Sequence, residues 1–509
     1  MSFPIPMRGC RLLIFLSAAF ALAFGGCTKS EGTTVGGAGT ASASAKSKAK
    51  SKKSAKPREK ADAEPSSPSE TAPVDKESAG ADPPQRVVRP TLKPPAHDDD
   101  RLAELGIYRY ESKHLVLYTD IDPDLARPLP KLMDEAYTAW EDYFGPLPPD
   151  SAGTDFQMVG YIMADTGRFR AAKLFGDDSQ ILLEGVFRDQ LFWMKDQRDD
   201  YWRRHLMLHE GTHCFMSAFP NPTNQFRWYM EGMAELFRAH QTDAGGKTRF
   251  RVFPTDNESF GGLGWLRLID EDLHAAGPLT IEEVVGQASA DFEKYNAYAW
   301  SWALCAFLDG HPRYRDRFRR LGTLVTGRRD ARFELEQVYH EAWPDLCEEW
   351  LVFAGNVCYG YDIERTVIDL HPGKPLGGQG DKVKLEIGPD RGWQTSGILL
   401  EKDRTYKLSA IGRSVVADDP RPWESEPQGI SFRYHAGLPV GMLVAVIRGT
   451  ELHEKAPHTT MLEVLPVGRE CLLTPRITGT LYFRVNDFWN ELADNTGSYQ
   501  VTIKEPTGE

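Results

Sequence analysis

The pentad His209-Glu210-Gly211-Thr212-His213 constrains the folded part of this chain more than any other feature. It lies inside the apolar stretch LMLHEGTHCFM, which predicts a helix over residues 201–219, closed by Pro220 and Pro222. Positions i and i+4 of a helix share one face, so two imidazoles at this spacing can reach one zinc ion. Glu210 points round from that face and can reach water at the metal.

A second motif supplies the ligand that the two histidines lack. Glu231 and Glu235 lie in WYMEGMAELF, on a predicted helix over residues 226–240 that follows the pentad. A zinc site with two histidines needs a third protein ligand, and a carboxylate on an apolar helix is costly unless it binds a cation. We therefore expect Glu231 to ligate the metal and Glu235 to accept the other ring N–H of a ligand histidine.

Together, HEGTH and WYMEGMAELF resemble the motifs of gluzincin metallopeptidases, in which HExxH is followed by a helix that contains EG. The resemblance extends over about residues 101–362 and implies a zincin-like α+β domain that hydrolyses peptide bonds. It assigns His209, His213 and Glu231 as zinc ligands, and Glu210 as general base and later proton donor. The chain lacks the GAMEN motif of aminopeptidases and the third histidine of metzincins, which favours an endopeptidase.

Enzymes of this kind also offer a Tyr or His to the oxyanion of the tetrahedral intermediate. Tyr298, in NAYAWSWALCAFL on a predicted helix over residues 295–309, is the first candidate, and Tyr295 and His240 are weaker ones. The alternative for Tyr298 is a structural role in the core. The stretch DQLFWMKDQ (189–197) is expected to be the edge strand that pairs with an extended peptide substrate.

The order of the predicted elements indicates an α+β domain followed by an all-β domain. Strands are expected at 107–119 and 156–163, with a helix over 128–144 between them, and residues 181–194 have room for one or two more strands. Helices dominate from residue 201 to about residue 353. After about residue 361, segments of alternating apolar and polar residues recur between Gly, Pro and Asp turns, which predicts a β-sandwich. We place the zincin-like domain at 101–364 and the sandwich at 365–509. The expected strands are 383–387, 398–402, 406–412, 429–435, 442–449, 480–487 and 498–504.

The order of segments in this second domain is similar to that of the PA-IL-like calcium-dependent lectins. The best match is Asn486-Asp487, a short loop, and then Asp494-Asn495-Thr496-Gly497. The resemblance implies a calcium site, with a backbone carbonyl near Val416 as one ligand. The side-chain ligands that it implies are Asp487, Glu491, Asp494 and Asn495.

The match to these lectins is incomplete at the residues that would contact calcium and sugar. Glu491 stands where the lectin has Thr, and Ser425 stands where it has a sugar-contacting His, although Gln428 matches a sugar-contacting Gln. Galactose specificity is therefore not implied. The alternative to a calcium site is an Asp/Asn-rich turn between two strands.

The N-terminus predicts export. Arg8 and Arg11 lie just before the apolar run 12–24, which suits a signal peptide and is too short to span a membrane as a mature helix. Gly25-Gly26-Cys27 resembles the bacterial lipobox, so we expect a signal peptide over 1–27 and a lipid anchor on Cys27 at the bacterial cell envelope. Plain secretion with a chance Cys is the alternative.

Residues 28–100 are rich in Gly, Ala, Ser, Lys and Pro and predict a disordered tether. The tether is either a solvated spacer or a segment that adheres to an anionic surface through the basic residues between Lys46 and Lys60. The net charge of −13 argues against a general nucleic-acid binder. Five cysteines follow Cys27 without regular spacing, and this predicts free thiols rather than a disulfide framework.

Three functions fit these observations. The first is an exported, lipid-anchored zinc peptidase that acts on a peptide or protein, with a lectin-like accessory domain. The second is a catalytically silent surface lipoprotein whose sandwich binds glycan or wall polymer. The third is a structural lipoprotein whose metal site only stabilises the fold. The complete set of His209, Glu210, His213 and Glu231 favours the first, because a silent domain need not keep the general base.

Overall fold

The computed structural model describes residues 88–175, 185–219, 226–262, 264–321, 331–377, 380–419, 421–450 and 459–505, all in the unit Asp82–Glu509. The predicted signal peptide, the lipid anchor on Cys27 and the tether up to residue 87 lie outside these residues. Within the last part of the predicted tether, Arg89 is buried and its backbone pairs with Asp150. The first helix begins at Asp99, capped by Asp98.

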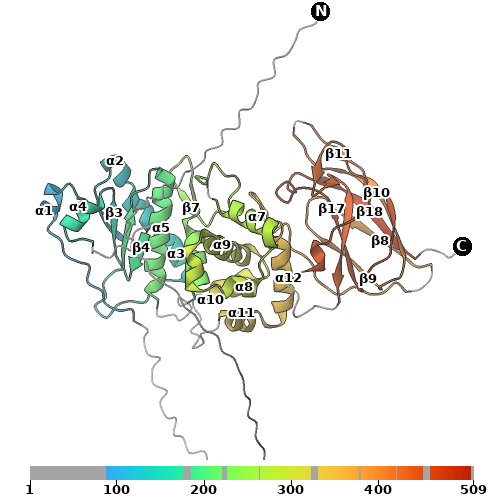
Figure 1. The fold of residues 1–509 in the computed structure, drawn as a ribbon, viewed down its shortest axis with the longest axis horizontal. Helices are drawn as coiled ribbons and strands as arrows, with labels where there is room; N and C mark the ends of the chain where they lie inside the picture. The colour runs from blue at the N-terminus through green and yellow to red at the C-terminus, as the bar shows by residue number, and fades with distance from the viewer. Residues whose placement is uncertain are drawn as a thin grey trace, which may run out of the picture. The chain divides into compact units, whose positions relative to one another are not determined.

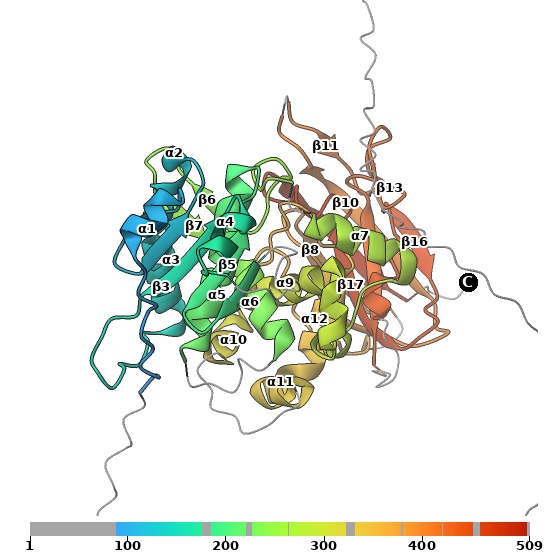
Figure 2. The same cartoon turned by 60° about the vertical axis from the view of Figure 1, so that its left-hand side comes forward.

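The first part of the described chain is built on a five-stranded sheet with the order β1-β2-β3-β5-β4 (Figure 2). The three central strands are parallel, and the two edge strands pair with them in the antiparallel direction. The strands are β1 Tyr108–Glu111, β2 Leu115–Thr119, β3 Met158–Met163, β4 Gly185–Arg188 and β5 Leu191–Lys195.

Two sequence predictions about this sheet are corrected. Residues 107–119 form two strands rather than one, because the chain reverses after β1 and Asp134 holds the turn by accepting hydrogen bonds from Ser112 Oγ and His114 N. Residues 189–197 do not form the edge strand, since β5 lies between β3 and β4. A two-residue hairpin turn, with Asp189 at a φ of 55°, folds β4 back along β5 and makes β4 the edge.

Both faces of this sheet are covered by helices, because apolar residues occupy both faces of its central strands. Leu117 and Ile162 point into the main core with α3 and α5, whereas Val116 and Tyr161 point into a second core with Phe169 of α4. The helices of this part are α1 Asp99–Glu104, α2 Pro123–Ala126, α3 Leu129–Phe144, α4 Thr166–Ala171 and α5 Asp200–Ser217.

Helices dominate the next part, with α9 packed against α6, α7, α8, α10 and α12 (Figure 1). Gly232 on α6 permits a close approach to α9, because a Cβ there would lie 2.6 Å from the carbonyl oxygen of Ser301. In the described part of the chain, no helix has the length and apolar character to cross a membrane. The elements are α6 Arg227–Arg238, β6 His240–Thr242, β7 Thr248–Phe250, α7 Trp265–Ala276, α8 Ile281–Val285, α9 Tyr295–Gly310, α10 Arg315–Leu321, α11 Ala331–Tyr339 and α12 Trp343–Ala354.

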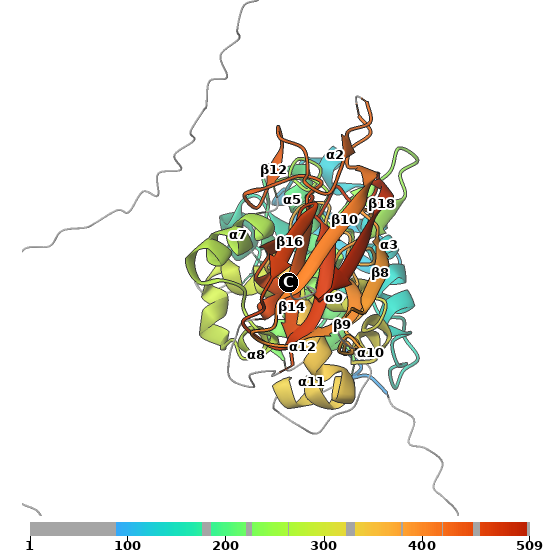
Figure 3. The same cartoon turned by 90° about the vertical axis from the view of Figure 1, so that its right-hand side faces the viewer.

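The C-terminal part is rich in strands, which form two larger sheets around a shared core (Figure 3). One sheet has the order β11-β10-β18-β8, with β16 also paired to β10, and the other has the order β15-β14-β17-β9. The strands are β8 Lys382–Ile387, β9 Gln394–Leu400, β10 Tyr406–Val415, β11 Glu424–Ser425, β12 Tyr434–His435, β13 Leu438–Pro439, β14 Leu443–Gly449, β15 Leu465–Pro466, β16 Glu470–Leu473, β17 Gly479–Val485 and β18 Thr496–Lys504.

Most strands predicted in this part are confirmed, but the one over 429–435 is not. Only Tyr434–His435 is extended there, in a small hairpin with β13. Gly429, with a φ of 80°, turns the chain where the strand was expected to begin. The chain as described is therefore mixed α and β, with a β-rich C-terminal region in several sheets. The zincin-like assignment of its first part remains a prediction.

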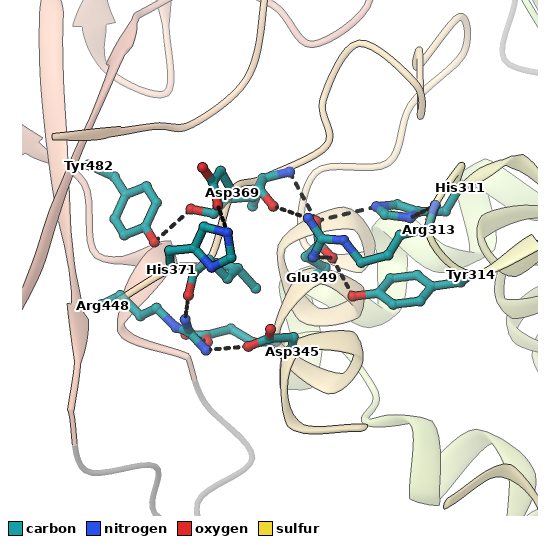
Figure 4. Close-up of polar contacts among 12 residues, drawn as sticks. His311, Arg313, Tyr314, Asp345, Glu349, Asp369, His371, Arg448 and Tyr482 are labelled. Carbon is teal, nitrogen blue, oxygen red and sulfur yellow. Dashed lines mark hydrogen bonds and ion pairs between the residues drawn. The ribbon is translucent and has the colours of Figure 1, made fainter. Parts of the chain in front are cut away.

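Buried charges tie helix α12 to the segment that leads into the β-rich region (Figure 4). Glu349 accepts hydrogen bonds from the backbone N–H of Ile368 at 2.9 Å, from Arg313 at 3.1 Å and from the Tyr314 hydroxyl. Arg448 of β14 donates to Glu348 at 2.6 Å and to Asp345 at 2.7 Å. These contacts satisfy carboxylates that burial would otherwise destabilise.

We expect Arg448→Met to destabilise the protein by about 3 kcal/mol, because it leaves the buried carboxylate of Glu348 without its cation. The free energy of urea unfolding measures the loss. Arg413→Met is the matched control, since Arg413 pairs with Glu424 at the surface and its removal should cost at most about 0.5 kcal/mol. Equal effects of the two substitutions would contradict the role of Arg448.

Candidate metal centre

Helices α5 and α6 bring together three side-chain atoms that could bind one metal ion. The Nε2 atoms of His209 and His213 lie 3.1 Å apart, and Oε2 of Glu231 lies 3.4 Å and 3.2 Å from them, respectively. All three side chains are buried. Among the described residues, His209, His213 and Glu231 thus form a group that could hold a metal ion, with all three ligand atoms within 4.8 Å of one another.

The local sequence explains why these atoms converge. Asp199 caps α5 by accepting a hydrogen bond from Trp202 N, and the helix then runs without interruption through the pentad. Gly211 lets α5 approach the sheet-covering helix α3, because a Cβ there would lie 2.9 Å from the sulfur of Met133. The two histidines, four residues apart, therefore lie on one face of a fixed helix.

The charges at this centre fit a bound cation. Burial disfavours the charged form of His209, but the carboxylates of Glu231 and Glu235 outweigh it and raise the pKa of His209 to about 10. Burial also acts against ionised Glu231, yet His213 and His209 hold the pKa of that carboxyl well below its usual range. Two imidazoles with one carboxylate are a ligand set that zinc accepts, and a metal ion bound here would take the place of the proton that these groups share.

Glu235 lies beside the ring nitrogen of His209 that faces away from His213 and Glu231. Its Oε1 lies 3.1 Å from Nδ1 of His209. Its Oε2 accepts a hydrogen bond from the Trp265 indole at 2.6 Å and lies 2.6 Å from Nε of Arg238. Because these partners fix the carboxylate, it can orient the imidazole with Nε2 toward the ligand group.

Glu210 is buried next to the edge strand β4. The backbone of Gly185 approaches the Glu210 carboxylate so closely that a Cβ at this position would overlap Oε1. Phe187, two residues further along β4, stacks on the His213 ring with 4.6 Å between centroids. Burial raises the pKa of Glu210, although His209 and His213 act in the opposite direction.

Of the three oxyanion candidates, Tyr298 has its ring beside that of His209. Its centroid is 6.4 Å from that of His209, and burial followed by the charge of Glu231 raises the pKa of Tyr298 to about 12. Tyr295 is mostly exposed and contacts Trp265. His240 is buried against Tyr201, and its Nδ1 pairs with the carbonyl of Arg238.

Sequence reasoning missed three residues at this centre: Arg227, Phe187 and Trp265. Arg227 pairs with Glu231, and its spacing of four residues on the same helix was a signal that could have revealed it. Phe187 and Trp265 come from β4 and α7, which are distant along the chain. No local pattern links them to the pentad.

Of the four predicted calcium ligands, two lie together and two have other partners. Asp487 and Asn495 are buried together, with Asn495 Nδ2 donating to Asp487 Oδ2 at 2.9 Å, and burial raises the pKa of Asp487 to about 6. Glu491 instead binds Arg433 through both oxygens at 2.8 Å. Asp494 is exposed and accepts the backbone N–H of Asp418 at 3.3 Å. The structure therefore brings two of the four together.

Two of the cysteines predicted to be free thiols are buried as such. Cys214 lies on α5 next to His213, and Cys305 lies on α9. Burial raises the pKa of both thiols well above the usual value, which suppresses the reactive thiolate. Neither is therefore a candidate nucleophile.

Comparison with known proteins gives little. No family model matches the chain, and no curated protein matches it. A solved structure titled "EclA N-terminal domain; PllA-like lectin" is similar over 24% of this chain and 95% of that chain, with 16% identity and a TM-score of 0.19. This likeness is weak and distant, so function has to be inferred from the chemistry of the site.

We expect the purified protein to hold about one zinc per chain, because the two imidazoles and the carboxylate already face one another. His209→Ala/His213→Ala should lose the metal, and elemental analysis after reconstitution measures both. His274→Ala, at an exposed position on α7, is the control that should keep it. Zinc retained by the double variant would place the metal elsewhere.

Proposed function

We propose that this chain is a zinc-dependent peptidase in which His209, His213 and Glu231 hold the metal and Glu210 is the general base. The observation that carries the proposal is the convergence of two imidazole nitrogens and one carboxylate oxygen beside the buried Glu210. A purely structural metal site would not need that fourth residue. Zinc, when bound, supplies a Lewis acid that polarises a peptide carbonyl and acidifies water.

Glu210 moves the proton in this proposal. Its carboxylate takes a proton from water as the oxygen attacks the carbonyl carbon, and it then gives the proton to the leaving amine nitrogen. Burial suits this role, because it raises the pKa of the carboxyl and so makes the carboxylate a stronger base. The close backbone of Gly185 limits how far the side chain can swing.

Tyr298 is the proposed hydrogen-bond donor to the oxygen that becomes negative during attack. With a pKa raised to about 12, its hydroxyl keeps its proton at neutral pH. It comes from α9 and lies beside His209, whereas Phe187 of β4 lies beside His213. In this proposal Glu210 of α5 activates the water molecule, and Tyr298 of α9 contacts the oxygen of the substrate carbonyl.

The substrate in this proposal is an extended peptide or a protein segment. β4 is at the edge of the sheet beside Glu210, and the backbone of an edge strand can pair with an added strand. This gives internal peptide bonds a way to reach the centre, which agrees with an endopeptidase. With the lipid anchor predicted on Cys27, the enzyme would act at the bacterial cell envelope.

Glu210→Gln should keep zinc and abolish peptide cleavage, because the amide cannot accept the proton from water. His213→Ala should lose both zinc and cleavage. Turnover of a fluorogenic peptide library and metal content measure the two properties. Glu271→Gln, at an exposed site on α7, should change neither. Cleavage by Glu210→Gln at the rate of the parent would disprove the mechanism.

Absence of zinc from the parent, even after reconstitution, would instead favour the second hypothesis. In that case the β-rich region is the functional part, and glycan arrays with and without calcium are the next measurement. Asp487 and Asn495 are the residues to substitute there, since they are the two predicted calcium ligands that lie together.

Tyr298→Phe should lower kcat by about 100-fold or more without changing zinc content, because it removes one donor to the oxyanion. KM should change little, since the lost contact forms in the transition state. Tyr295→Phe is the matched control on the same helix. If Tyr295→Phe lowers kcat and Tyr298→Phe does not, the roles of the two tyrosines are reversed.

A further inference from the structure

Arg227 contacts the side of Glu231 that faces away from the two histidines. Its Nε lies 3.0 Å from Oε1 of Glu231, whereas Oε2 is the oxygen near His209 and His213. The two oxygens of this carboxylate therefore have separate partners. Glu231 is buried, but the Arg227 side chain is about half exposed, with a relative accessibility of 47%.

Helix stability does not explain why an arginine occupies this position. Arg227 is the first residue of α6, where a positive charge opposes the helix dipole. The order Arg before Glu at a spacing of four residues is also the less favourable one in helices. The contact is instead accounted for by the buried carboxylate of Glu231, whose second oxygen Arg227 pairs with.

Two further contacts link Arg227 to the proposed oxyanion donor. The guanidinium lies over the ring of Phe292, 5.4 Å from its centroid, and Phe292 meets Tyr298 edge to face at 5.3 Å. Arg227 also acts on the Tyr298 hydroxyl, since it lowers the pKa of that group against the larger effect of burial. One guanidinium thus connects α6, the 3-10 helix Ser289–Glu293 and α9.

We propose that Arg227 is a positioning residue that leaves only Oε2 of Glu231 for the metal and holds the Tyr298 hydroxyl beside it. A guanidinium suits this task, because its planar fork can donate to two acceptors in fixed directions. Without it, Glu231 is free to rotate and to offer either oxygen, so the ligand group is less preorganised. The inference rests on the proposed zinc site.

The test compares zinc affinity in the full-length protein and its variants by competition with a chromophoric chelator. Arg227→Gln should weaken zinc binding by about 10-fold, the lower end of what residues that orient metal ligands contribute. Arg267→Gln is the matched control, since Arg267 and Glu271 form a pair of the same order and spacing at the surface of α7. That variant should bind zinc like the parent.

Cobalt substitution provides a readout that does not depend on activity. The visible absorption bands of cobalt-loaded Arg227→Gln should differ from those of the parent, because the coordination by Glu231 changes, whereas Arg267→Gln should leave them unchanged. Arg227→Lys keeps the charge but loses the fork, so it should resemble Arg227→Gln more than the parent. Thermal unfolding of the metal-free proteins checks that each variant folds, and Arg227→Lys carries the test if Arg227→Gln does not.

The outcomes separate this inference from the proposed function. Unchanged zinc affinity and unchanged cobalt bands in the Arg227 variants would overturn the inference while leaving the peptidase intact. A parent that binds zinc but cleaves no peptide would overturn the proposed activity, and the affinity of Arg227→Gln would still decide the positioning role. A parent that binds no zinc would overturn both.

Discussion

Burying the carboxylate of Glu231 on an apolar helix costs free energy, and the two imidazoles of α5 are what offset it. Their contacts hold the pKa of Glu231 low and, together with Glu235, raise that of His209. Charged contacts as well as apolar ones therefore hold α5 against α6. The arrangement of Glu210, β4 and Tyr298 around this centre depends on that packing being exact to within an ångström or so.

Small residues let the elements around the centre come close enough. Gly232 brings α6 against α9, the helix that carries Tyr298, and Gly185 brings the edge strand against Glu210. A side chain at Gly232 would push α6 away from α9, and one at Gly185 would push β4 away from Glu210. Glycine is unfavourable inside a helix or strand, so its presence here reflects packing at the site rather than local stability.

The β-rich region is joined to the helices by charge as well as by apolar contact. Arg448 of β14 donates to Glu348 and Asp345 of α12, and Glu349 of α12 accepts the backbone N–H of Ile368 in the connecting segment. At the other end of this region, Arg433 occupies both oxygens of Glu491, which the lectin resemblance had assigned to calcium. Arginine–carboxylate pairs thus stabilise the junction with α12, and in the β-rich region such a pair occupies Glu491, a residue that was expected to bind calcium.

The sequence by itself determined helices α5 and α6 and indicated the residues of the candidate metal centre, because the spacing in HEGTH and the apolar helix around Glu231 are local patterns. It also indicated most of the C-terminal strands by their alternation. Only the tertiary structure decided that β4 rather than β5 is the edge strand and that Phe187 and Trp265 reach the centre. Those contacts join residues far apart in the chain, and their geometry follows from packing that no short stretch of sequence encodes.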